Sequence, residues 1–572
     1  MGKFLLGLLT GAILIILIGV IGFFAVASLR SKPPAVAGDS TLILHLWGDV
    51  PEKPPVEFAI PGVVSRSSIT VESVWSMLRR AAQDSRIKAV IFEPQGASVG
   101  WATMQEIRGD LEAFRKSGKP LYAYLQSPSL RDYYMASAAS RIYMPPSDLL
   151  NVKGIGFQLM YFKGTLDKLG VQVDVEHAGA YKDYGDQFTR ASMSPETKEV
   201  MNSLADGLYG DLLSVIAKAR NKSVDAVRAL IDQGPFLATQ AKANGLVDEL
   251  RYEDQVFGEM KTALHQNELK KVSEKEYAEV SDSSAGMAAQ DQIAFVVAEG
   301  TIQRGDDSDG LESGDFDRMI DRVKGDSRVK AAIIRINSPG GEVVASDDMW
   351  RALNELKNKK PLVISMGDEA ASGGYYMAMT GSPIVAEPGT LTGSIGVVFG
   401  KPNLHGLYDK LGITKDTVSR GKFALIDSDY SSLGPEERAK LKEGIDATYQ
   451  DFLDKVSKSR NRPVSEIEPV AQGRVWLGDQ ARDKGLVDSV GGIDAAIAKA
   501  RQIAGIPSSS RVGLVLYPAK KSLFEYITEA FGGGGSDDEM DTLLRRVIKD
   551  PRLRVWAHPG MMRMMPFSVE FQ

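Results

Sequence analysis

The sequence predicts a layered α/β fold, made of two tandem repeats that follow an N-terminal transmembrane helix. Short apolar segments typical of buried strands, such as residues 89–92 and 332–336, alternate with amphipathic stretches typical of helices, such as residues 349–357. Parallel strands need a long crossover between them, and a helix usually supplies it. The alternation therefore indicates parallel strands covered by helices, and its recurrence in both halves of the chain indicates a duplication.

Two pairs of matching segments indicate that a whole domain was duplicated. Residues 84–89 (DSRIKA) return as residues 326–331 (DSRVKA), an offset of 242 positions (326 minus 84). Residues 133–136 (YYMA) return unchanged as residues 375–378 at the same offset. A period of this length corresponds to the copying of a complete folding unit.

The N-terminal segment predicts a membrane anchor. Residues 4–28 contain no charged side chain, and as a helix they would span about 37 Å, which exceeds the roughly 30 Å hydrocarbon core of a bilayer. A cleavable signal peptide is the alternative, because residues 25–27 (AVA) resemble a cleavage site. The apolar run is longer than the about 7–15 residues usual in signal peptides, which favours an uncleaved helix.

Changes in composition divide the chain into seven expected segments. They are residues 1–3 as a cytoplasmic N-terminus, 4–29 as the transmembrane anchor, 30–40 as a tether, 41–265 as the first repeat, 266–291 as a linker, 292–505 as the second repeat, and 506–572 as a C-terminal extension with a glycine-rich hinge. The extension also holds four closely spaced methionines, Met561, Met562, Met564 and Met565. We expect this methionine-rich tail to be a satellite packing segment; a hydrophobic binding surface is the alternative.

Bulk composition excludes several classes of function. The chain has 572 residues, 43% hydrophobic and 25% charged, which is enough for two or three domains with substantial cores. A formal net charge of -6 gives no support to nucleic-acid binding, which normally requires a basic surface. The chain has no cysteine, so disulfides, thiolate metal sites and cysteine nucleophiles are excluded.

The two repeats differ at the positions on which a hydrolytic site would depend. Ser372 lies in the segment ASGGYY of the second repeat, whereas the first repeat has Leu130 at the corresponding position. Conversely, the first repeat carries Lys182 in the segment GAYK, and the second repeat has Ala424 there. Each repeat lacks a side chain that the other retains. Whether Lys182 and Ser372 meet within one chain or between chains stays open at this point.

Three glycine-containing turns are candidates for a catalytic site. Residues 337–341 (NSPGG) follow a predicted buried strand, where a glycine turn can bind an oxyanion through backbone N–H groups or form a plain loop. Small residues on both sides of Ser372 favour a sharp strand-to-helix turn that presents Oγ, and a serine that only caps a helix is the alternative. Ser394 supplies another hydroxyl in the turn LTGSIG.

A nucleophilic serine needs a base, and the sequence favours lysine over histidine. None of the five histidines occupies a repeated or glycine-framed turn, and His405 is the least implausible member of a Ser-His-Asp triad. A lysine base must have its pKa lowered by roughly 2–3 units through burial. Lys182 lies between Tyr181 and Tyr184, where partial burial is conceivable, although a solvated surface lysine is the alternative.

Four motifs resemble those of the signal peptide peptidase A (protease IV) family in its long, duplicated form. They are SPGG at residues 338–341, ASGGY at 371–375, LTGSIG at 391–396 and GAYK at 179–182. The resemblance covers residues 1 to about 505. It implies repeats with a fold like that of Clp protease and the crotonases, a Ser-Lys dyad, and hydrolysis of signal-peptide remnants on the periplasmic side of a bacterial inner membrane.

The resemblance also implies roles for particular residues. Ser372 matches the nucleophile, Lys182 the general base and Ser394 an accessory serine that hydrogen-bonds the lysine, while backbone N–H groups of Gly340 and Gly373 would bind the oxyanion. No metal or organic cofactor is implied. The lysine segment departs from the family pattern, because Asp183 and Asp186 make it more acidic, and carboxylates that face the site would favour the charged lysine.

The resemblance implies a homotetramer that encloses a chamber above the membrane and admits extended apolar peptides. Two other functions stay open from the sequence. A crotonase-type acyl-thioester enzyme would use a similar glycine-rich oxyanion hole, but the anchor, the serine in a glycine turn and the separate lysine argue against it. A non-catalytic membrane scaffold would explain the lost side chains, but the intact glycine turns around Ser372 argue against it.

Overall fold

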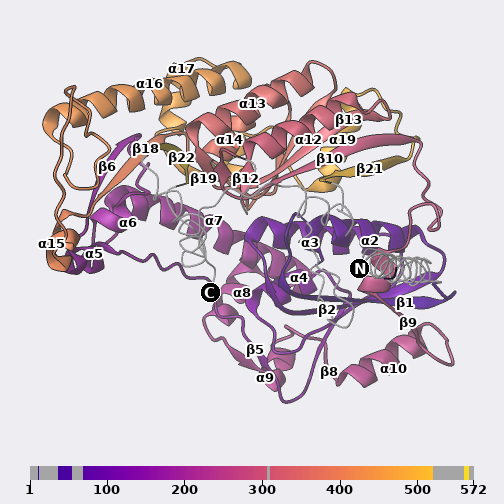
Figure 1. Ribbon diagram of the computed structural model, residues 1–572. Coiled ribbons are helices and arrows are strands. Elements are labelled where there is room, and N and C mark those ends of the chain that lie inside the picture. Colours follow the sequence, from indigo (N-terminus) through magenta and orange to yellow (C-terminus); the bar gives the residue numbers. More distant parts are fainter. Residues whose placement is uncertain (1–10, 12–35, 54–68, 306–309, 519–559, 566–572) are drawn as a thin grey trace.

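The computed structural model describes residues 11, 36–53, 69–305, 310–518 and 560–565, and these residues form two α/β lobes (Figure 1). Each lobe is built on a large sheet, and helices α2 (Val71–Gln83) and α3 (Trp101–Arg115) of the first lobe lie between the two sheets. The expected anchor at residues 4–29 lies almost wholly outside the described residues. No helix within those residues has the length and apolar character of a membrane span.

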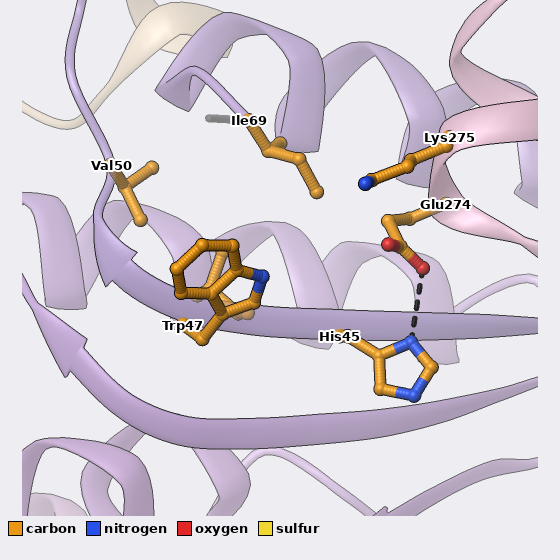
Figure 2. A pocket seen from close by; sticks show the side chains of 7 residues that line it. His45, Trp47, Val50, Ile69, Glu274 and Lys275 are labelled. Atoms are coloured by element: carbon orange, nitrogen blue, oxygen red, sulfur yellow. Dashed lines mark hydrogen bonds and ion pairs between the residues drawn. The ribbon is translucent and has the colours of Figure 1, made fainter. Parts of the chain in front are cut away.

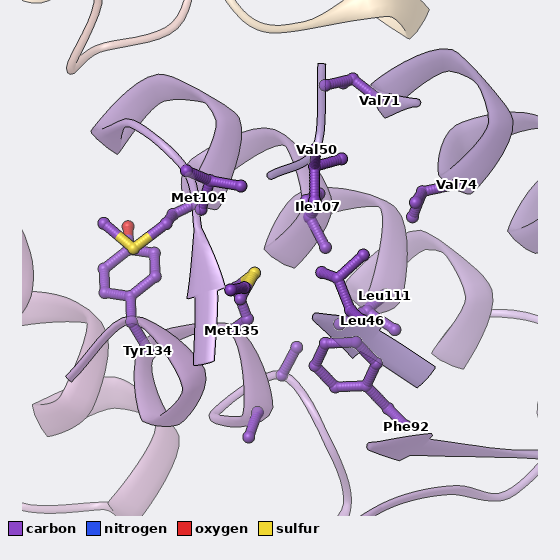
Figure 3. Close-up of a cluster of buried hydrophobic side chains, with 14 of the residues drawn as sticks. Leu46, Val50, Val71, Val74, Phe92, Met104, Ile107, Leu111, Tyr134 and Met135 are labelled. Carbon is purple, nitrogen blue, oxygen red and sulfur yellow. The ribbon is translucent and has the colours of Figure 1, made fainter. Parts of the chain in front are cut away.

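The sheet of the first lobe has six parallel strands in the order β8-β4-β3-β2-β1-β9. They are β1 (Ser40–Asp49), β2 (Ile87–Ser98), β3 (Leu121–Tyr124), β4 (Arg141–Met144), β8 (Glu249–Leu250) and β9 (Lys270–Ser273). Buried apolar side chains of the central strands, including Leu46 and Phe92, pack against Ile107 and Leu111 of α3 (Figure 3). This burial explains why the central strands read as apolar runs.

The sheet of the second lobe repeats this order. Its strands lie in the spatial order β20-β16-β15-β13-β10-β21, which matches the order β8-β4-β3-β2-β1-β9 of the first lobe. Strands β17 and β19 extend the second sheet beside β15. The strands are β10 (Asp291–Glu299), β13 (Val329–Ser338), β15 (Leu362–Ala371), β16 (Ile384–Ala386), β17 (Leu391–Gly393), β19 (Val475–Leu477), β20 (Ser489–Val490) and β21 (Val512–Tyr517). The shared strand order agrees with the predicted tandem duplication.

The helices follow the same duplication. In the first lobe they are α2, α3, α4 (Leu130–Ala136), α5 (Lys163–Leu169), α6 (Asp186–Thr189), α7 (Pro195–Arg220), α8 (Val224–Ile231), α9 (Ala238–Ala243), α10 (Glu253–Ala263) and α11 (Glu274–Ala278). In the second lobe they are α12 (Ser313–Gly325), α13 (Val343–Lys357), α14 (Gly373–Met377), α15 (His405–Leu411), α16 (Pro435–Arg460), α17 (Val464–Ile467), the 3-10 helix η1 (Glu468–Val470), α18 (Gly478–Asp483) and α19 (Ile493–Ile503). The long helices α7 and α16 each have 26 residues and begin with proline, so they are counterparts.

Both large sheets extend beyond the expected bounds of the repeats. Strand β9 and helix α11 lie inside the expected linker at residues 266–291, and β21 lies beyond residue 505. Each of these strands pairs with the first strand of its lobe, β9 with β1 and β21 with β10. The linker is therefore part of the first lobe, and the start of the C-terminal extension is part of the second.

A third sheet joins the two lobes and the C-terminal segment. Its order is β12-β11-β14-β22-β18-β6, with β6 (Gln172–Ala178) from the first lobe, β11 (Ile302–Gln303), β12 (Leu311–Glu312), β14 (Gly340–Glu342) and β18 (Val397–Asn403) from the second, and β22 (Gly560–Met564) from the C-terminal extension. Strands β6 and β18 form, with α5 and α15, an arm that projects from the lobes (Figure 1). A small separate sheet pairs β5 (Leu149–Leu150) with β7 (Phe236–Leu237).

Buried charged groups join the two lobes. The fully buried Arg335 of β13 donates to Glu52 at 2.6 and 2.8 Å and also to Glu106 of α3. At the start of α3, the N–H groups of Gly100 and Thr103 donate to the Asp368 carboxylate at 3.2 and 2.8 Å. A carboxylate at this position satisfies helix N–H groups and complements the helix dipole. These contacts fix the first lobe to the second.

Glu387→Gln is expected to stabilise the protein at alkaline pH. Burial, with added repulsion from Glu106, raises the pKa of Glu387 to about 8. The folded protein therefore favours the protonated form of Glu387. The stability that this preference contributes is complete below the pKa of Glu387 in the unfolded chain, and it is lost as pH rises through about 8. The amide cannot ionise, so the variant should unfold with a free energy about 3–5 kcal/mol above wild type at pH 9 and with little difference at pH 5.

Urea unfolding at the two pH values measures this difference. Glu443→Gln, at an exposed glutamate of α16, is the matched control and should follow the wild type at both pH values. Equal pH dependence of the Glu387→Gln variant and wild type would show that Glu387 is already ionised in the folded state.

Candidate active site

Ser372 lies at a sharp turn between β15 and α14. Its backbone has φ +55° and ψ −112°, a conformation that is costly for a residue with a Cβ. Its N–H donates to Gly393 O at 2.9 Å, and its carbonyl accepts the N–H of Tyr376 at 2.8 Å. A Cβ at Gly374 would lie 2.8 Å from Ser338 O, which explains the glycine after the turn. The predicted strand-to-helix turn is thus present, and strain of this kind is typical of functional sites.

Lys182 reaches the second lobe because the arm crosses between the lobes. Strand β6 of the first lobe pairs with β18 of the second along its whole length, from Gln172 opposite Asn403 to Ala178 opposite Val397. After this strand, the N–H of Tyr181 donates to Gln472 O at 2.8 Å, which holds the next turn against the second lobe. The fully buried Lys182 side chain then points at Ser372, with Nζ 2.8 Å from Oγ.

Ser394 supplies two further contacts of the lysine amine. Lys182 Nζ lies 2.8 Å from Ser394 Oγ and 2.9 Å from Ser394 O. A neutral amine has two N–H donors and one lone pair, so it can donate to the two oxygens of Ser394 and accept the hydroxyl proton of Ser372. Lys182, Ser372 and Ser394 are all fully buried. Burial disfavours a charged amine, and the geometry therefore suits a lysine that takes a proton from Ser372.

The glycine turn at residues 338–341 borders the same site. Gly340 has φ +103°, and helix α14, which begins at Gly373, packs against β14. The N–H of Gly340 donates to Ser338 Oγ at 3.2 Å. Two N–H groups are expected to bind an oxyanion, those of Gly340 and Gly373. The Gly340 N–H is thus hydrogen-bonded to the Ser338 hydroxyl, whereas Gly373 directly follows Ser372 at the start of α14.

Comparison with protein families decides the classification. The model of peptidase family S49 matches residues 113–267 and 354–507, one segment in each lobe and together more than half of the chain. The chain belongs to peptidase family S49. The two matched segments also support the tandem repeats predicted from the sequence.

Relatives of this S49 peptidase agree with the family. The chloroplastic serine protease SPPA of Arabidopsis thaliana is 38% identical over 486 residues, covering 83% of this chain and 71% of its own. Protease 4 of Salmonella typhi is 32% identical and that of Haemophilus influenzae 29% identical, over 81% and 86% of this chain and 78% and 82% of their own. Among solved structures, ClpP1 from Listeria monocytogenes has a TM-score of 0.22 at 15% identity, covering 35% of this chain and 91% of its own. The predicted resemblance to signal peptide peptidase A and protease IV is confirmed, and the S49 peptidase is a serine peptidase.

Two of the histidines weighed as alternative bases, His45 and His405, have partners away from the Ser372 turn. His45 of β1 lies 2.9 Å from the Glu93 carboxylate and 3.0 Å from the Glu274 carboxylate. Figure 2 shows the contact with Glu274. Hydrogen bonds to these carboxylates raise the pKa of His45 to about 10, so its ring is charged at neutral pH and cannot act as a base. His405, the first residue of α15, stacks on Tyr430, and α15 lies at the far end of the arm from α14 (Figure 1).

The acidic residues that follow Lys182 have partners outside the Ser372 turn. The hydroxyl of Thr197, at the start of α7, donates to the Asp183 carboxylate. Burial raises the pKa of Asp183 to about 6 and raises the pKa of Asp186 as well. Raised pKa values reduce the negative charge that these residues carry at mildly acidic pH, which limits their stabilisation of a lysine cation there.

Two features of the site were not foreseen from the sequence. The loop at residues 472–474 holds the lysine segment, and a Cβ at Gly473 would lie 2.6 Å from Lys182 Cβ, so only glycine fits.

The second feature lies in the first lobe, where the buried carboxylate of Asp132 accepts the N–H groups of Gly96 and Ala97 at 3.1 and 3.3 Å. At the offset of 242, Gly96 corresponds to Ser338 (338 minus 96), so a carboxylate occupies the turn that in the second lobe faces the candidate site. A glycine between buried elements is the signal that points to the first feature; nothing in the sequence distinguishes Asp132.

Proposed function

We propose that the chain is a membrane-anchored serine endopeptidase that degrades cleaved signal peptides and other extended apolar peptides. Ser372 acts as nucleophile and Lys182 as general base. The observation that carries the proposal is the 2.8 Å hydrogen bond between Lys182 Nζ and Ser372 Oγ in a fully buried setting. The distance is within the range needed for direct proton transfer, and burial favours the neutral amine that a base requires.

The proposed reaction is acyl transfer through a covalent ester. Neutral Lys182 takes the hydroxyl proton as Ser372 Oγ attacks the scissile carbonyl, and the ammonium then gives this proton to the leaving amine. Water next attacks the ester, loses a proton to Lys182, and the proton returns to Ser372 as the acid product leaves. Ser394 holds the amine in place, and the N–H groups of Gly373 and Gly340 stabilise the oxyanion once Gly340 turns from Ser338.

Peptide hydrolysis by the full-length chain tests the proposal. An unstructured, leucine-rich peptide should be cut within its length, and an acyl-CoA thioester of similar apolar content should not be consumed. Turnover of the thioester without cleavage of the peptide would instead support a crotonase-type enzyme.

A single-pass membrane anchor in a bacterial inner membrane, with both lobes in the periplasm, is part of the proposal. It is supported by the uncharged run at residues 4–28, which is long enough to cross a bilayer. The full-length chain should therefore stay in the membrane pellet after an alkaline carbonate wash, whereas a chain that starts at residue 36 should be released. Release of both chains would contradict the anchor.

A homotetramer is also proposed, with the arm as a contact between copies. Large apolar side chains on the arm and beside it are exposed, including Met160 at 72%, Leu411 at 64% and Val418 at 88%. Exposed apolar side chains gathered in one region are typical of protein contacts. Light scattering of the detergent-solubilised chain should give the mass of four copies, and Leu411→Asp with Val418→Asp should lower it. An unchanged mass would place the contact elsewhere.

A further inference from the structure

The C-terminal strand β22 lies directly beside the candidate active site. It pairs with β14, the strand of the Gly340 turn, and with β18, the strand that follows the Ser394 turn, and it is antiparallel to both. In the register with β14, Met564 lies opposite Gly340 and Met562 opposite Glu342. Beyond the strand, the N–H of Met565 donates to Pro339 O at 2.8 Å. The segment thus runs along the glycine turn that borders the Ser372 site.

Strand β22 separates two parts of the third sheet that share no pairing with each other. On one side are β12, β11 and β14, and on the other are β18 and β6. Neighbouring strands lie about 4.8 Å apart, so the space between β14 and β18 has the width of one extended peptide. An extended peptide is commonly bound by adding a strand to an open sheet edge, where main-chain hydrogen bonds give affinity and side-chain pockets give specificity.

Alternate side chains of β22 are buried in the lysine region. Met562 and Met564 pack in one cluster with Tyr184 and Val398. Tyr184 follows Lys182 by two residues, so these methionines are held by the same segment that carries the proposed base. The methionine side chain is unbranched and adaptable, and it fills irregular apolar pockets. The side chains of a leucine-rich peptide could fill the same pockets. The segment therefore has the backbone direction, the register and the apolar side chains expected of a bound peptide.

We propose that residues 560–565 are an internal competitor of the substrate. They occupy the place of the substrate residues on the amino-terminal side of the scissile bond, because the strand runs toward the Gly340 turn. A peptide must displace this segment before it can bind, and the cleft between β14 and β18 takes extended peptides whose alternate side chains are unbranched and apolar. The inference rests on the proposed function for its effect on catalysis, but the occupancy of the cleft can be measured without turnover.

The test compares peptide binding with and without a seated tail. In a full-length chain that carries Ser372→Ala, so that no peptide is consumed, Met562→Asp with Met564→Asp places two carboxylates where apolar burial is required, and the segment should leave. The affinity for a fluorescent leucine-rich octapeptide, measured by anisotropy, should rise about tenfold or more. Val224→Asp with Leu237→Asp, at two exposed apolar positions of the first lobe away from the arm, is the matched control and should leave the affinity unchanged.

A free peptide with the sequence of residues 560–565 completes the experiment. It should compete with the octapeptide for the double-aspartate variant. The same peptide with Met562→Asp and Met564→Asp should compete less, because the charges cannot be buried. Unchanged affinity in the double-aspartate variant, absence of binding to either chain, or loss of near-ultraviolet circular dichroism in the variant would each overturn the inference and make β22 a structural strand. If affinity rises but the corresponding chain with Ser372 intact cuts no peptide, the proposed function fails and the inference stands.

Discussion

Ser372→Ala should lower kcat/KM for peptide hydrolysis by at least about 10⁴-fold. Without Oγ no ester can form, and only binding and the oxyanion donors would remain to assist direct attack by water. The expected loss lies in kcat, because the removed hydroxyl acts on the reacting carbonyl and contributes little to ground-state binding. Steady-state kinetics on the leucine-rich peptide, with circular dichroism to verify the fold, measures the effect.

Ser346→Ala is the matched control for this prediction. Ser346 is also fully buried in the second lobe, but its hydroxyl donates to the carbonyl of Glu342 one helical turn earlier. Removing that bond should change stability slightly and leave kcat within a few-fold of wild type. Comparable activity of Ser372→Ala and wild type would rule out Ser372 as the nucleophile.

Lys182→Met should lower kcat by about 10³–10⁴-fold, because the serine then has no base to take its proton. Methionine has a similar length and is apolar, so it fits the buried site without introducing a charge. It leaves the oxygens of Ser394 without the amine, which is expected to cost about 1–3 kcal/mol of stability. Hydrolysis rates measured alongside urea unfolding separate the catalytic loss from this cost.

Lys360→Met provides the control for removal of a lysine amine. Lys360 Nζ donates to the carbonyls of Asp326 and Val329 at 2.8 and 2.9 Å. Val329 is the first residue of β13 and Asp326 lies just before it, so both are at the opposite end of the strand from Ser338. This variant should keep kcat near that of wild type while losing some stability. If Lys182→Met retained the activity of the Lys360→Met variant, another group would have to act as the base.

Much of the fold could be predicted because the relevant signals are local. The apolar strands and the repeated segments indicate two α/β repeats, and the glycine turns around Ser372 and Ser394 indicate where strands end. Strand β9, by contrast, reads KKVS, which has little apolar content, and its position is set by pairing with the distant β1. Pairings between segments far apart in sequence leave no local pattern, and for this reason the sequence predicts a linker at residues 266–291 where the first lobe continues.

The candidate site was predictable in its residue types and less so in its assembly. Glycine-framed motifs single out Ser372 and Lys182, but the arm that carries the lysine into the second lobe depends on pairing between β6 and β18. The position of the methionine-rich tail follows from the same kind of long-range pairing, and composition alone indicated only an apolar segment. Gly473 is a signal in the sequence for a close approach at the loop of residues 472–474, but only the fold shows that the approaching segment is the one that carries Lys182.

Asp132 is an obstacle to a second site in the first lobe. Its carboxylate is tethered next to the N–H groups of Gly96 and Ala97 and also accepts the hydroxyl of Ser129 at 2.7 Å. An incoming carbonyl oxygen would have to compete with this carboxylate, which the chain itself holds beside the two N–H groups. A serine restored at position 130 would therefore meet a turn that is already filled. At least two changes, a serine at position 130 and the removal of the Asp132 carboxylate, would therefore be needed before this turn could act as its counterpart in the second lobe is proposed to act.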